Sequence, residues 1–265
     1  MNLILSSLQL NTKKYNILVT RPEHQAETLC HLIEKQGWNA IRFPTLQIVG
    51  IDNKNIRQQL GALKQYQWLI FISVNAVNFA LKANDGKIGC FNNCTIAAVG
   101  KATKKALLSY GLRVDLVPEN HFNTEGLLAT TKMNNVQGKS CLIVRGKGGR
   151  EALANCLRER GAKVEYMEVY ARIKPCHSDF TVKELLEQGK LHAITITSSE
   201  ALLNLLTMLD ETLHCMLRAI PLIVISNRIK EQAEKSGFKQ IAVTEYPGDA
   251  AIIKTVIMRL GTQQK

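Results

Sequence analysis

Two compact clusters of basic residues are of a type that could bind an anion. They are residues 101–105 (KATKK) and 145–150 (RGKGGR), and each lies where an apolar run gives way to a polar stretch. The chain carries 34 Lys and Arg against 22 Asp and Glu, a formal net charge of +12. Nucleic-acid binders usually show longer basic runs or stacking aromatic residues along a strand face. The short clusters therefore favour a small polyanionic ligand over nucleic acid.

These clusters would be positioned by short apolar strands, each followed by a polar turn and an amphipathic helix. Helices are predicted at residues 25–35, 76–82, 102–110, 150–160, 200–209 and 229–236. β-Branched runs that alternate with helices favour parallel sheets covered on both faces. Four glycines fit the C-terminal caps of these helices: Gly37, Gly111, Gly161 and Gly237. Because helix N-termini attract negative charge, the strand-to-helix turns are candidate carboxylate sites.

The chain repeats itself at a spacing of about 125 residues. Residues 17–21 (ILVTR) return as 142–145 (LIVR), and 71–77 (FISVNAV) return as 196–202 (ITSSEAL). A third pair follows at 98–100 (AVG) and 224–226 (VIS). The repeat predicts two similar α/β domains, and a cleft between such domains commonly holds a small molecule.

Two extended segments, 39–49 and 163–174, interrupt the alternation of strands and helices. Each follows the cap glycine of a paired first helix, so we expect two strands that cross between the domains and pair with each other. Pro44 suits an edge position. The domains are either consecutive halves divided near residue 129, or an outer domain of 1–42 plus 175–265 around an inner domain of 43–174. The crossing strands favour the second division.

Other features exclude several classes of protein. The apolar runs are too short to span a membrane, and no signal peptide is recognisable, so we expect a cytoplasmic protein. The seven cysteines are scattered without paired metal-ligand spacing. The RGKGGR run lacks the spacing of nucleotide-binding loops, which disfavours a nucleotide-dependent transferase. Nothing in the sequence demands a dimer, so we expect a monomer.

Over residues 17–260 the sequence resembles the uroporphyrinogen-III synthase family. No single motif is specific, but their order and spacing over the full length are. The motifs are 18–22 (LVTRP), 42–44 (RFP), 71–77 (FISVNAV), 98–103 (AVGKAT), 117–119 (VPE), 124–128 (TEGLL), 144–151 (VRGKGGRE) and 165–172 (EYMEVYAR).

The resemblance implies two three-layer α/β domains with parallel sheets, joined by a two-stranded antiparallel β-ladder that acts as a hinge. It also implies a reaction: linear hydroxymethylbilane loses water and closes to uroporphyrinogen III with the last pyrrole ring inverted. Family members need no metal or organic cofactor. The substrate carries eight carboxylates, which would explain the positive charge. A transient contact with the preceding enzyme of the pathway is a further expectation, whereas nucleic acid and membranes are not expected partners.

Tyr170 matches the tyrosine of the family's crossing strand, and the resemblance implies that it donates a proton to the departing hydroxyl. The alternative is a half-buried strand tyrosine with its hydroxyl hydrogen-bonded. A phenol is a weak acid at neutral pH, with an ordinary pKa of about 10, so positioning by the fold should dominate. Tyr166 lies four residues earlier and is therefore expected on the same strand face.

The resemblance also implies substrate-binding residues at the ends of strands. Gly100 and Thr103 match the family's Gly-x-x-Thr turn, with helix capping as the alternative. The second-half counterpart has Ser226 and Arg228 in place of the family's glycine and threonines, so no threonine role is carried over. Ser226 remains a substrate-binding candidate that is also expected to cap the helix, and Arg228 is expected to bind a carboxylate. Ser73 and Ser198 match the family's serines at the ends of strands, with helix capping alone as the alternative. Arg21 and Arg145 are candidates because they are positive groups at strand ends, where open α/β sheets bind ligands.

Two functions from different classes remain open. The first is the cofactor-free cyclase, and the second is a non-catalytic two-domain module that binds a small polyanion. Tyr170 in its family context favours the cyclase, because a binding module would not require it.

Overall fold

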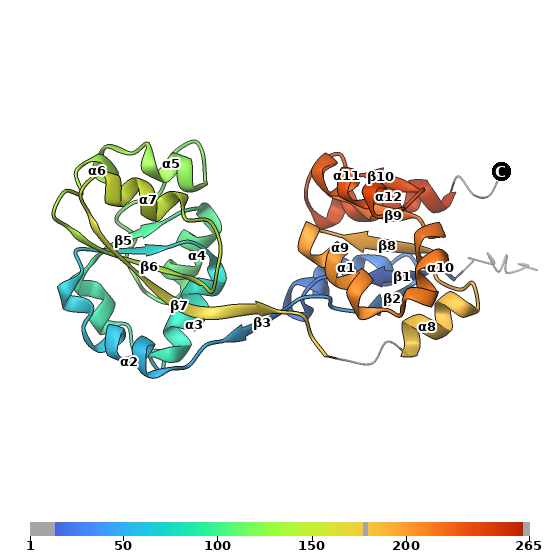
Figure 1. Ribbon diagram of the computed structural model, residues 1–265, viewed down its shortest axis with the longest axis horizontal. Helices are drawn as coiled ribbons and strands as arrows, with labels where there is room; N and C mark the ends of the chain where they lie inside the picture. Colours follow the sequence, from blue (N-terminus) through green and yellow to red (C-terminus); the bar gives the residue numbers. More distant parts are fainter. Residues whose placement is uncertain (1–13, 177–179, 262–265) are drawn as a thin grey trace, which may run out of the picture. The chain divides into compact units, whose positions relative to one another are not determined.

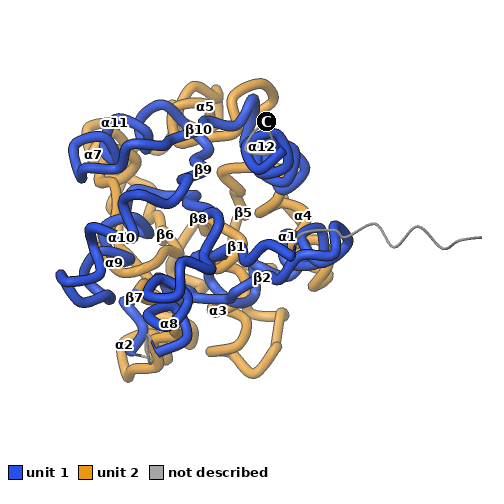
Figure 2. The backbone as a smooth tube through the Cα atoms, turned by 90° about the vertical axis from the view of Figure 1, so that its right-hand side faces the viewer, with its two compact units in different colours: residues 1–47, 173–265 blue, residues 48–172 orange. Residues whose placement is uncertain are grey.

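The computed structural model describes residues 14–176 and 180–261. Contacts between residues divide the chain into two compact units, shown in Figure 2. Unit 1 comprises Met1–Gln47 and Ile173–Lys265, and unit 2 comprises Ile48–Arg172. The chain thus divides after residues 47 and 172, not once near residue 129.

Unit 1 contains a sheet of five strands in the order β10-β9-β8-β1-β2. Every neighbouring pair in this sheet is parallel. The strands are β1 (Asn16–Val19), β2 (Asn39–Arg42), β8 (Ala193–Ile196), β9 (Leu222–Val224) and β10 (Ile241–Val243).

Unit 2 contains a second sheet of five strands in the order β3-β7-β6-β4-β5. The β4, β5, β6 and β7 neighbours pair in parallel, and β3 lies beside β7. The strands are β3 (Gln47–Gly50), β4 (Trp68–Phe71), β5 (Thr95–Ala98), β6 (Ser140–Gly146) and β7 (Lys163–Ile173).

The two sheets have the same strand order, which is the structural counterpart of the sequence repeat. The order β9-β8-β1-β2 in unit 1 corresponds to β5-β4-β6-β7 in unit 2, and a bridge from Ala97 to Leu116 takes the place of β10. Counted along the chain, unit 1 has the doubly wound 2-1-3-4-5 order, in which helices cover both faces of a parallel sheet. The predicted α/β class with two similar domains is confirmed.

Helices cover both faces of each sheet (Figure 1). Alternation along the strands explains this, because Leu18 faces one apolar core while Ile17 and Val19 face the other. In unit 1, one face is covered by α1 (Glu23–Glu34) and α12 (Asp249–Gly261). The opposite face is covered by α8 (Phe180–Glu187), α9 (Ser199–Met208), α10 (His214–Ala219) and α11 (Asn227–Lys235).

Unit 2 repeats this three-layer arrangement. One core contains residues of α2 (Lys54–Gly61), α3 (Val74–Ala83) and α4 (Lys101–Ser109). The other contains residues of α5 (Thr124–Leu128), α6 (Thr131–Asn134) and α7 (Ala152–Glu159). Short 3-10 turns complete the units at η1 (Leu63–Gln65), η2 (Gly89–Asn93) and η3 (Glu211–Leu213).

One local prediction is corrected by the structure. The segment 39–49 is not a single crossing strand but two short strands, β2 in the first sheet and β3 in the second. Pro44 lies at the break, where its missing N–H cannot continue a ladder. Its neighbours on either side still pair with the first sheet, since Phe43 N–H donates to Val19 and Thr45 N–H donates to Thr20. The expected pairing of the two segments is seen only in its second half, between β3 and β7.

The predicted helix caps are confirmed. Gly37, Gly111, Gly161 and Gly237 all have φ between 75° and 91°, the left-handed region that glycine adopts without strain. Within residues 14–176 and 180–261, none of the helices is both long and apolar enough to cross a membrane.

Candidate active site

Unit 2 has a cavity at the carboxyl ends of β4 and β6. From these two neighbouring strands the chain winds in opposite directions, to β5 and to β7, which makes this the point where doubly wound folds bind ligands. The cavity has a volume of about 270 Å³. Its lining combines apolar side chains with basic and aromatic ones, and it includes Thr124, Arg145, Lys147, Arg150, Tyr166, Tyr170 and Arg172.

Tyr170 lines this cavity and is only 2% exposed. Its ring stacks on Phe79 with the centroids 5.8 Å apart. Its hydroxyl lies 3.1 Å from the Ser73 hydroxyl, which also accepts the Ala76 N–H as the N-cap of α3. Gly146 faces the ring so closely that a Cβ there would lie 2.5 Å from the Tyr170 Cε2. The phenol is therefore held in one orientation from three sides.

Tyr166 does not share the strand face of Tyr170, so that prediction is wrong. The pairing of β6 with β7 shifts at Arg145 and Gly146, whose partners are Glu168 and Tyr170, so Val169 is an extra residue. Such a β-bulge reverses the alternation of side chains beyond it. Tyr166 consequently packs against the core under α7, whereas Tyr170 joins the core under α3. No pattern in the sequence signalled the bulge.

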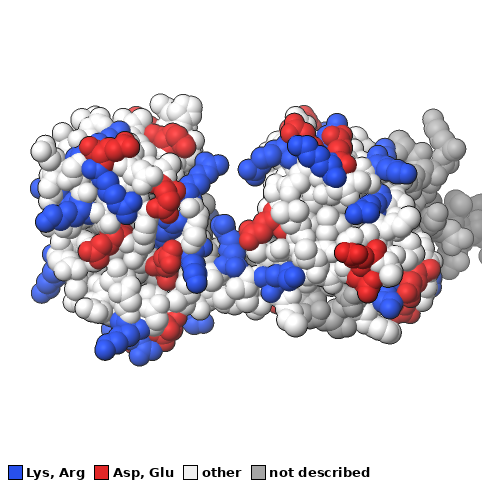
Figure 3. All heavy atoms as spheres, in the orientation of Figure 1, with Lys and Arg blue, Asp and Glu red and all other residues white. Residues whose placement is uncertain are grey.

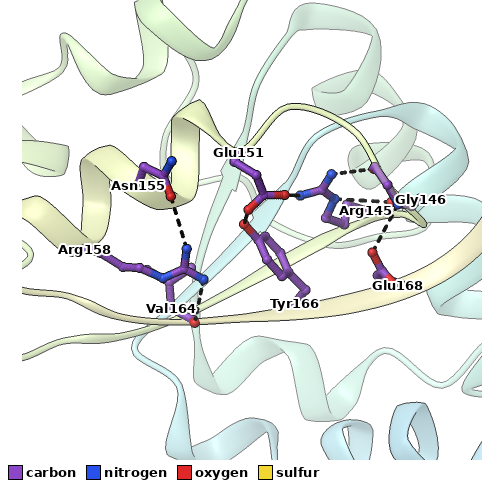
Figure 4. Close-up of polar contacts among 9 residues, drawn as sticks. Arg145, Gly146, Glu151, Asn155, Arg158, Val164, Tyr166 and Glu168 are labelled. Atoms are coloured by element: carbon purple, nitrogen blue, oxygen red, sulfur yellow. Dashed lines mark hydrogen bonds and ion pairs between the residues drawn. The ribbon is translucent and has the colours of Figure 1, made fainter.

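Arg145 lies beside the cavity in a cluster with Glu151 and Tyr166 (Figure 4). The Arg145 Nη1 donates to the Glu151 Oε1 at 3.0 Å, and the Tyr166 hydroxyl donates to the other Glu151 oxygen. The guanidinium lies over the Tyr166 ring, 4.6 Å from its centroid. The Tyr166 hydrogen bond and then Arg145 lower the pKa of Glu151, while burial and then Glu151 raise the pKa of Tyr166. The cluster thus holds a carboxylate and a neutral phenol at neutral pH.

Three cations of the cavity lining are exposed, in contrast to Arg145. Lys147 and Arg150 lie on the loop after β6, and Arg172 lies near the end of β7. The ion pair of Arg150 with Glu125 is long, at 4.0 Å, and both side chains are exposed. Exposed ammonium and guanidinium groups beside a cavity suit the carboxylates of a bound ligand. The sequence places Lys147 and Arg150 at a strand end, but nothing in it marks Arg172 or Glu151, although they belong to the motifs at 165–172 and 144–151.

Gly100 and Thr103 lie at the start of α4, which follows β5 at the same edge of the sheet. Gly100 is the N-cap residue, and a Cβ there would be in ordinary contact with Phe122 at 3.6 Å. Thr103 is buried, with 4% of its surface exposed. Lys101 lies over the Phe122 ring at 4.4 Å. The structure therefore brings the Gly-x-x-Thr turn to the strand-end edge that also carries Ser73.

In unit 1, the corresponding edge carries the remaining predicted residues. Arg21 follows β1 and forms an ion pair with Asp249 at the start of α12. Ser198 caps α9 by accepting the Ala201 N–H at 3.0 Å. Arg228 is exposed in the first turn of α11.

Ser226 occupies the N-cap position of α11, but its side chain makes no capping hydrogen bond, so the predicted cap is wrong. Its backbone is extended, with φ −161° and ψ 155°, as at Ser198. The difference between the two serines lies in the direction of the hydroxyl, which the sequence does not fix.

Ser198→Ala and Ser226→Ala form a matched pair for this difference. We expect Ser198→Ala to lower the free energy of unfolding by about 1 kcal/mol, because a helix N–H loses its acceptor. Ser226→Ala should change it by less than about 0.5 kcal/mol, because no such bond is lost. Urea unfolding of both variants checks this, and equal losses would contradict it.

Basic side chains form no continuous stripe on the face of the molecule drawn in Figure 3. On the face drawn in Figure 3, Lys and Arg side chains are interspersed with Asp and Glu on both units. Among the residues that the structure describes, no group of three or more His, Cys, Asp or Glu is arranged to hold a metal ion.

Comparisons with known proteins agree on one family. A family model described as uroporphyrinogen-III synthase HemD matches residues 27–254. The uroporphyrinogen-III synthase of Escherichia coli is 30% identical over 252 residues, which cover 91% of this chain and 99% of that protein. The protein of the same name from Salmonella typhimurium is 29% identical over 253 residues, covering 91% and 99%.

A solved structure agrees with the fold. The crystal structure of a mutant uroporphyrinogen III synthase from Thermus thermophilus has a TM-score of 0.62 at 16% identity, and the match covers 95% of this chain and 100% of that one. At this identity the likeness concerns the fold, while the sequence matches carry the family. The chain belongs to the uroporphyrinogen-III synthase family.

Proposed function

We propose that this protein converts hydroxymethylbilane to uroporphyrinogen III, with loss of water and inversion of the last pyrrole ring. The observation that carries the proposal is the match to proteins named uroporphyrinogen-III synthase over nearly the full length of both chains. The cavity of unit 2 supports it independently, because a buried phenol and exposed cations meet there.

The charges of the cavity suit this substrate. Hydroxymethylbilane carries eight carboxylates, and Lys147, Arg150 and Arg172 offer exposed cations beside the cavity. The helix N-termini at Ser73, Gly100 and Ser198 add backbone N–H donors at strand ends. We propose that these turns hold carboxylates and that the positive net charge attracts the substrate before it binds.

The other predicted binding residues differ in how freely they could bind a substrate carboxylate. Thr103 and Ser226 lie in the first turn and at the N-cap of their helices, where a hydroxyl can donate to a carboxylate. The exposed Arg228 extends that site on α11. Arg21 is partly committed to Asp249, so a ligand would use its remaining donors.

Tyr170 is the residue that we propose to act on the departing group. The bond between the hydroxymethyl carbon and its oxygen breaks, and the hydroxyl leaves as water with the phenol proton. Inversion of the last ring also requires that its bond to the neighbouring methylene bridge breaks and re-forms at the free carbon of the same ring. The proton that this carbon loses restores the phenol. Because the phenol is a weak acid, its contribution to the rate should lie at the low end of the range for a positioned general acid. Most of the rate would come from holding the two ends of the chain together.

The direct test supplies purified protein with enzymatically generated hydroxymethylbilane and resolves the uroporphyrinogen isomers. The expected product is isomer III. If only the spontaneous, non-inverted isomer I forms, the cyclase proposal fails and the polyanion-binding module replaces it.

Tyr170→Phe should lower kcat by about 100-fold while the fold stays intact, because only the hydroxyl is removed. Tyr110→Phe is the matched control, since Tyr110 is 45% exposed at the end of α4. Circular dichroism and the isomer assay measure both variants. An unchanged rate for Tyr170→Phe would remove the proton-donor role.

Three further expectations from the sequence stay predictions. They are a monomeric state, a cytoplasmic location and a transient contact with the enzyme that supplies hydroxymethylbilane.

A further inference from the structure

The loop after β6 carries two of the three exposed cations of the cavity. Residues 146–150 include three glycines, and two of them have positive φ, 71° at Gly148 and 119° at Gly149. A loop this rich in glycine has high conformational entropy, so an unrestrained loop would not hold Lys147 and Arg150 at fixed positions. Something else must order it.

Arg145 makes the contacts that order the loop. It is 3% exposed, and its three nitrogens reach the loop at its start, middle and end. The Nε donates to the Gly146 carbonyl at 3.2 Å, the Nη2 donates to the Gly148 carbonyl, and the Nη1 donates to Glu151 at 3.0 Å. Figure 4 shows the guanidinium turned toward the loop and Glu151. A rigid planar fork with several donors suits such a clamp better than an ammonium group.

The side chains around Arg145 complete the clamp. Glu151 neutralises the buried guanidinium, and the Tyr166 hydroxyl holds the second Glu151 oxygen. Glu168 accepts the Gly148 N–H at 3.2 Å. A buried cation that lost its carboxylate would be strongly destabilised, so Glu151 and Arg145 depend on each other.

Gly149 shows that the loop is built around the guanidinium. A Cβ at Gly149 would lie 2.7 Å from the Arg145 Nη2, closer than the two atoms can approach without a shift. The loop is also tied to the tyrosine strand, because Lys147 N–H donates to the Tyr170 carbonyl at 2.7 Å. The sequence RGKGGRE thus suits this fold of the loop, with glycine where the loop passes the Arg145 guanidinium.

We infer that Arg145 is a positioning residue, which with Glu151 and Tyr166 fixes the loop so that Lys147 and Arg150 face substrate carboxylates, and that Arg145 itself does not bind substrate. This replaces the role expected for Arg145 from the sequence. The inference deepens the proposed cyclase function and rests on it for the kinetic test, but not for the proteolysis test.

The first test measures the loop without any substrate. Trypsin cleaves after Lys and Arg, so cleavage after Lys147 and Arg150 reports loop opening. Glu151→Gln and Arg145→Gln should each speed this cleavage about tenfold, because each loses charge-assisted hydrogen bonds. The double variant should be cut no faster than the faster single one. Cleavage after the exposed Lys87 is the internal reference and should not change. Unchanged cleavage at the loop in both single variants would overturn the inference.

The second test separates a positioning role of Arg145 from substrate binding by the direction in which Glu151→Gln changes KM. If Arg145 bound substrate, Glu151→Gln would free the guanidinium and lower KM. The clamp predicts the opposite, that Glu151→Gln and Arg145→Gln both raise KM. Arg145→Lys should also raise KM, because one ammonium group cannot reach the three acceptors that the guanidinium contacts. A lower KM in Glu151→Gln would overturn the inference.

A double-variant cycle excludes a merely structural role. Lys147→Ala should raise KM about tenfold in the otherwise native protein, as expected for one charge-assisted contact. In the Glu151→Gln background it should raise KM by less than about twofold, because the cation is no longer held in place. An undiminished effect in that background would contradict the clamp. Failure to form isomer III with the native protein would end the cyclase proposal, while trypsin would still decide the clamp.

Discussion

Gly146→Ala should lower kcat by more than about 100-fold, although it adds only one methyl group and removes no charge. The added Cβ would lie 2.5 Å from Cε2 and 2.6 Å from Cζ of Tyr170. The Tyr170 ring cannot move away freely, because Phe79 stacks on it and Ser73 lies beside its hydroxyl. The ring must leave the orientation that the proposed proton transfer requires, and overpacking should also lower the free energy of unfolding by about 1–3 kcal/mol.

Three further variants show whether contact with the Tyr170 ring causes this loss. Gly89→Ala is the control, because no atom lies within 4 Å of its added Cβ, and it should change neither activity nor stability by much. Tyr170→Leu should remove the clash, so adding Gly146→Ala to it should cost little stability. Urea unfolding and the isomer assay measure all four proteins. Full stability loss from Gly146→Ala in the Tyr170→Leu background would show that the clash lies elsewhere.

Gly126→Ala should be the most destabilising single change of a glycine in unit 2. Its Cβ would lie 1.8 Å from the His121 carbonyl oxygen, which is backbone and cannot rotate away. Gly126 lies in α5, where Asn123 caps the helix by accepting the Gly126 N–H at 2.8 Å. The helix or the segment before it must open, at about 3 kcal/mol, the upper end of the usual cost of overpacking.

Activity should fall together with stability in Gly126→Ala, because Thr124 in the same short helix lines the cavity. Gly61→Ala is the matched control, a helical glycine with no atom within 4 Å of the added Cβ. It should leave stability unchanged or raise it by up to about 1 kcal/mol. Hydrogen exchange in residues 117–128 would locate the opening, and native protection there would contradict it.

Much of the fold could be predicted because its causes are local and periodic. The helix expected at 200–209 forms at Ser199–Met208, and the one expected at 102–110 forms at Lys101–Ser109. Apolar residues at helical spacing indicate both helices, and Gly111 marks the end of the second. The α12 helix was not predicted, although it packs Ile252 and Val256 against the first sheet.

The site was predicted less well, because side-chain direction and ion pairing depend on contacts between distant segments. The spacing of Tyr166 and Tyr170 indicated one shared face, but the bulge at Val169 exists only where β7 pairs with β6. Arg145 was expected to bind substrate from its place at a strand end. A buried cation at a strand end binds either a ligand or groups of the protein itself. Here the loop after β6 folds back onto Arg145, and the Gly148 carbonyl and the Glu151 carboxylate accept its hydrogen bonds.

The sequence by itself determined the α/β class, the doubled architecture, the family and the candidate tyrosine, because periodicity, repeats and ordered motifs are written along the chain. The tertiary structure alone decided which face Tyr170 occupies, that Gly146 confines its ring, and that Arg145 is enclosed by its own loop while Lys147 and Arg150 stay exposed. The physical reason is that burial and hydrogen-bond partners are set by strand pairing and packing between residues far apart in sequence, which local patterns do not encode.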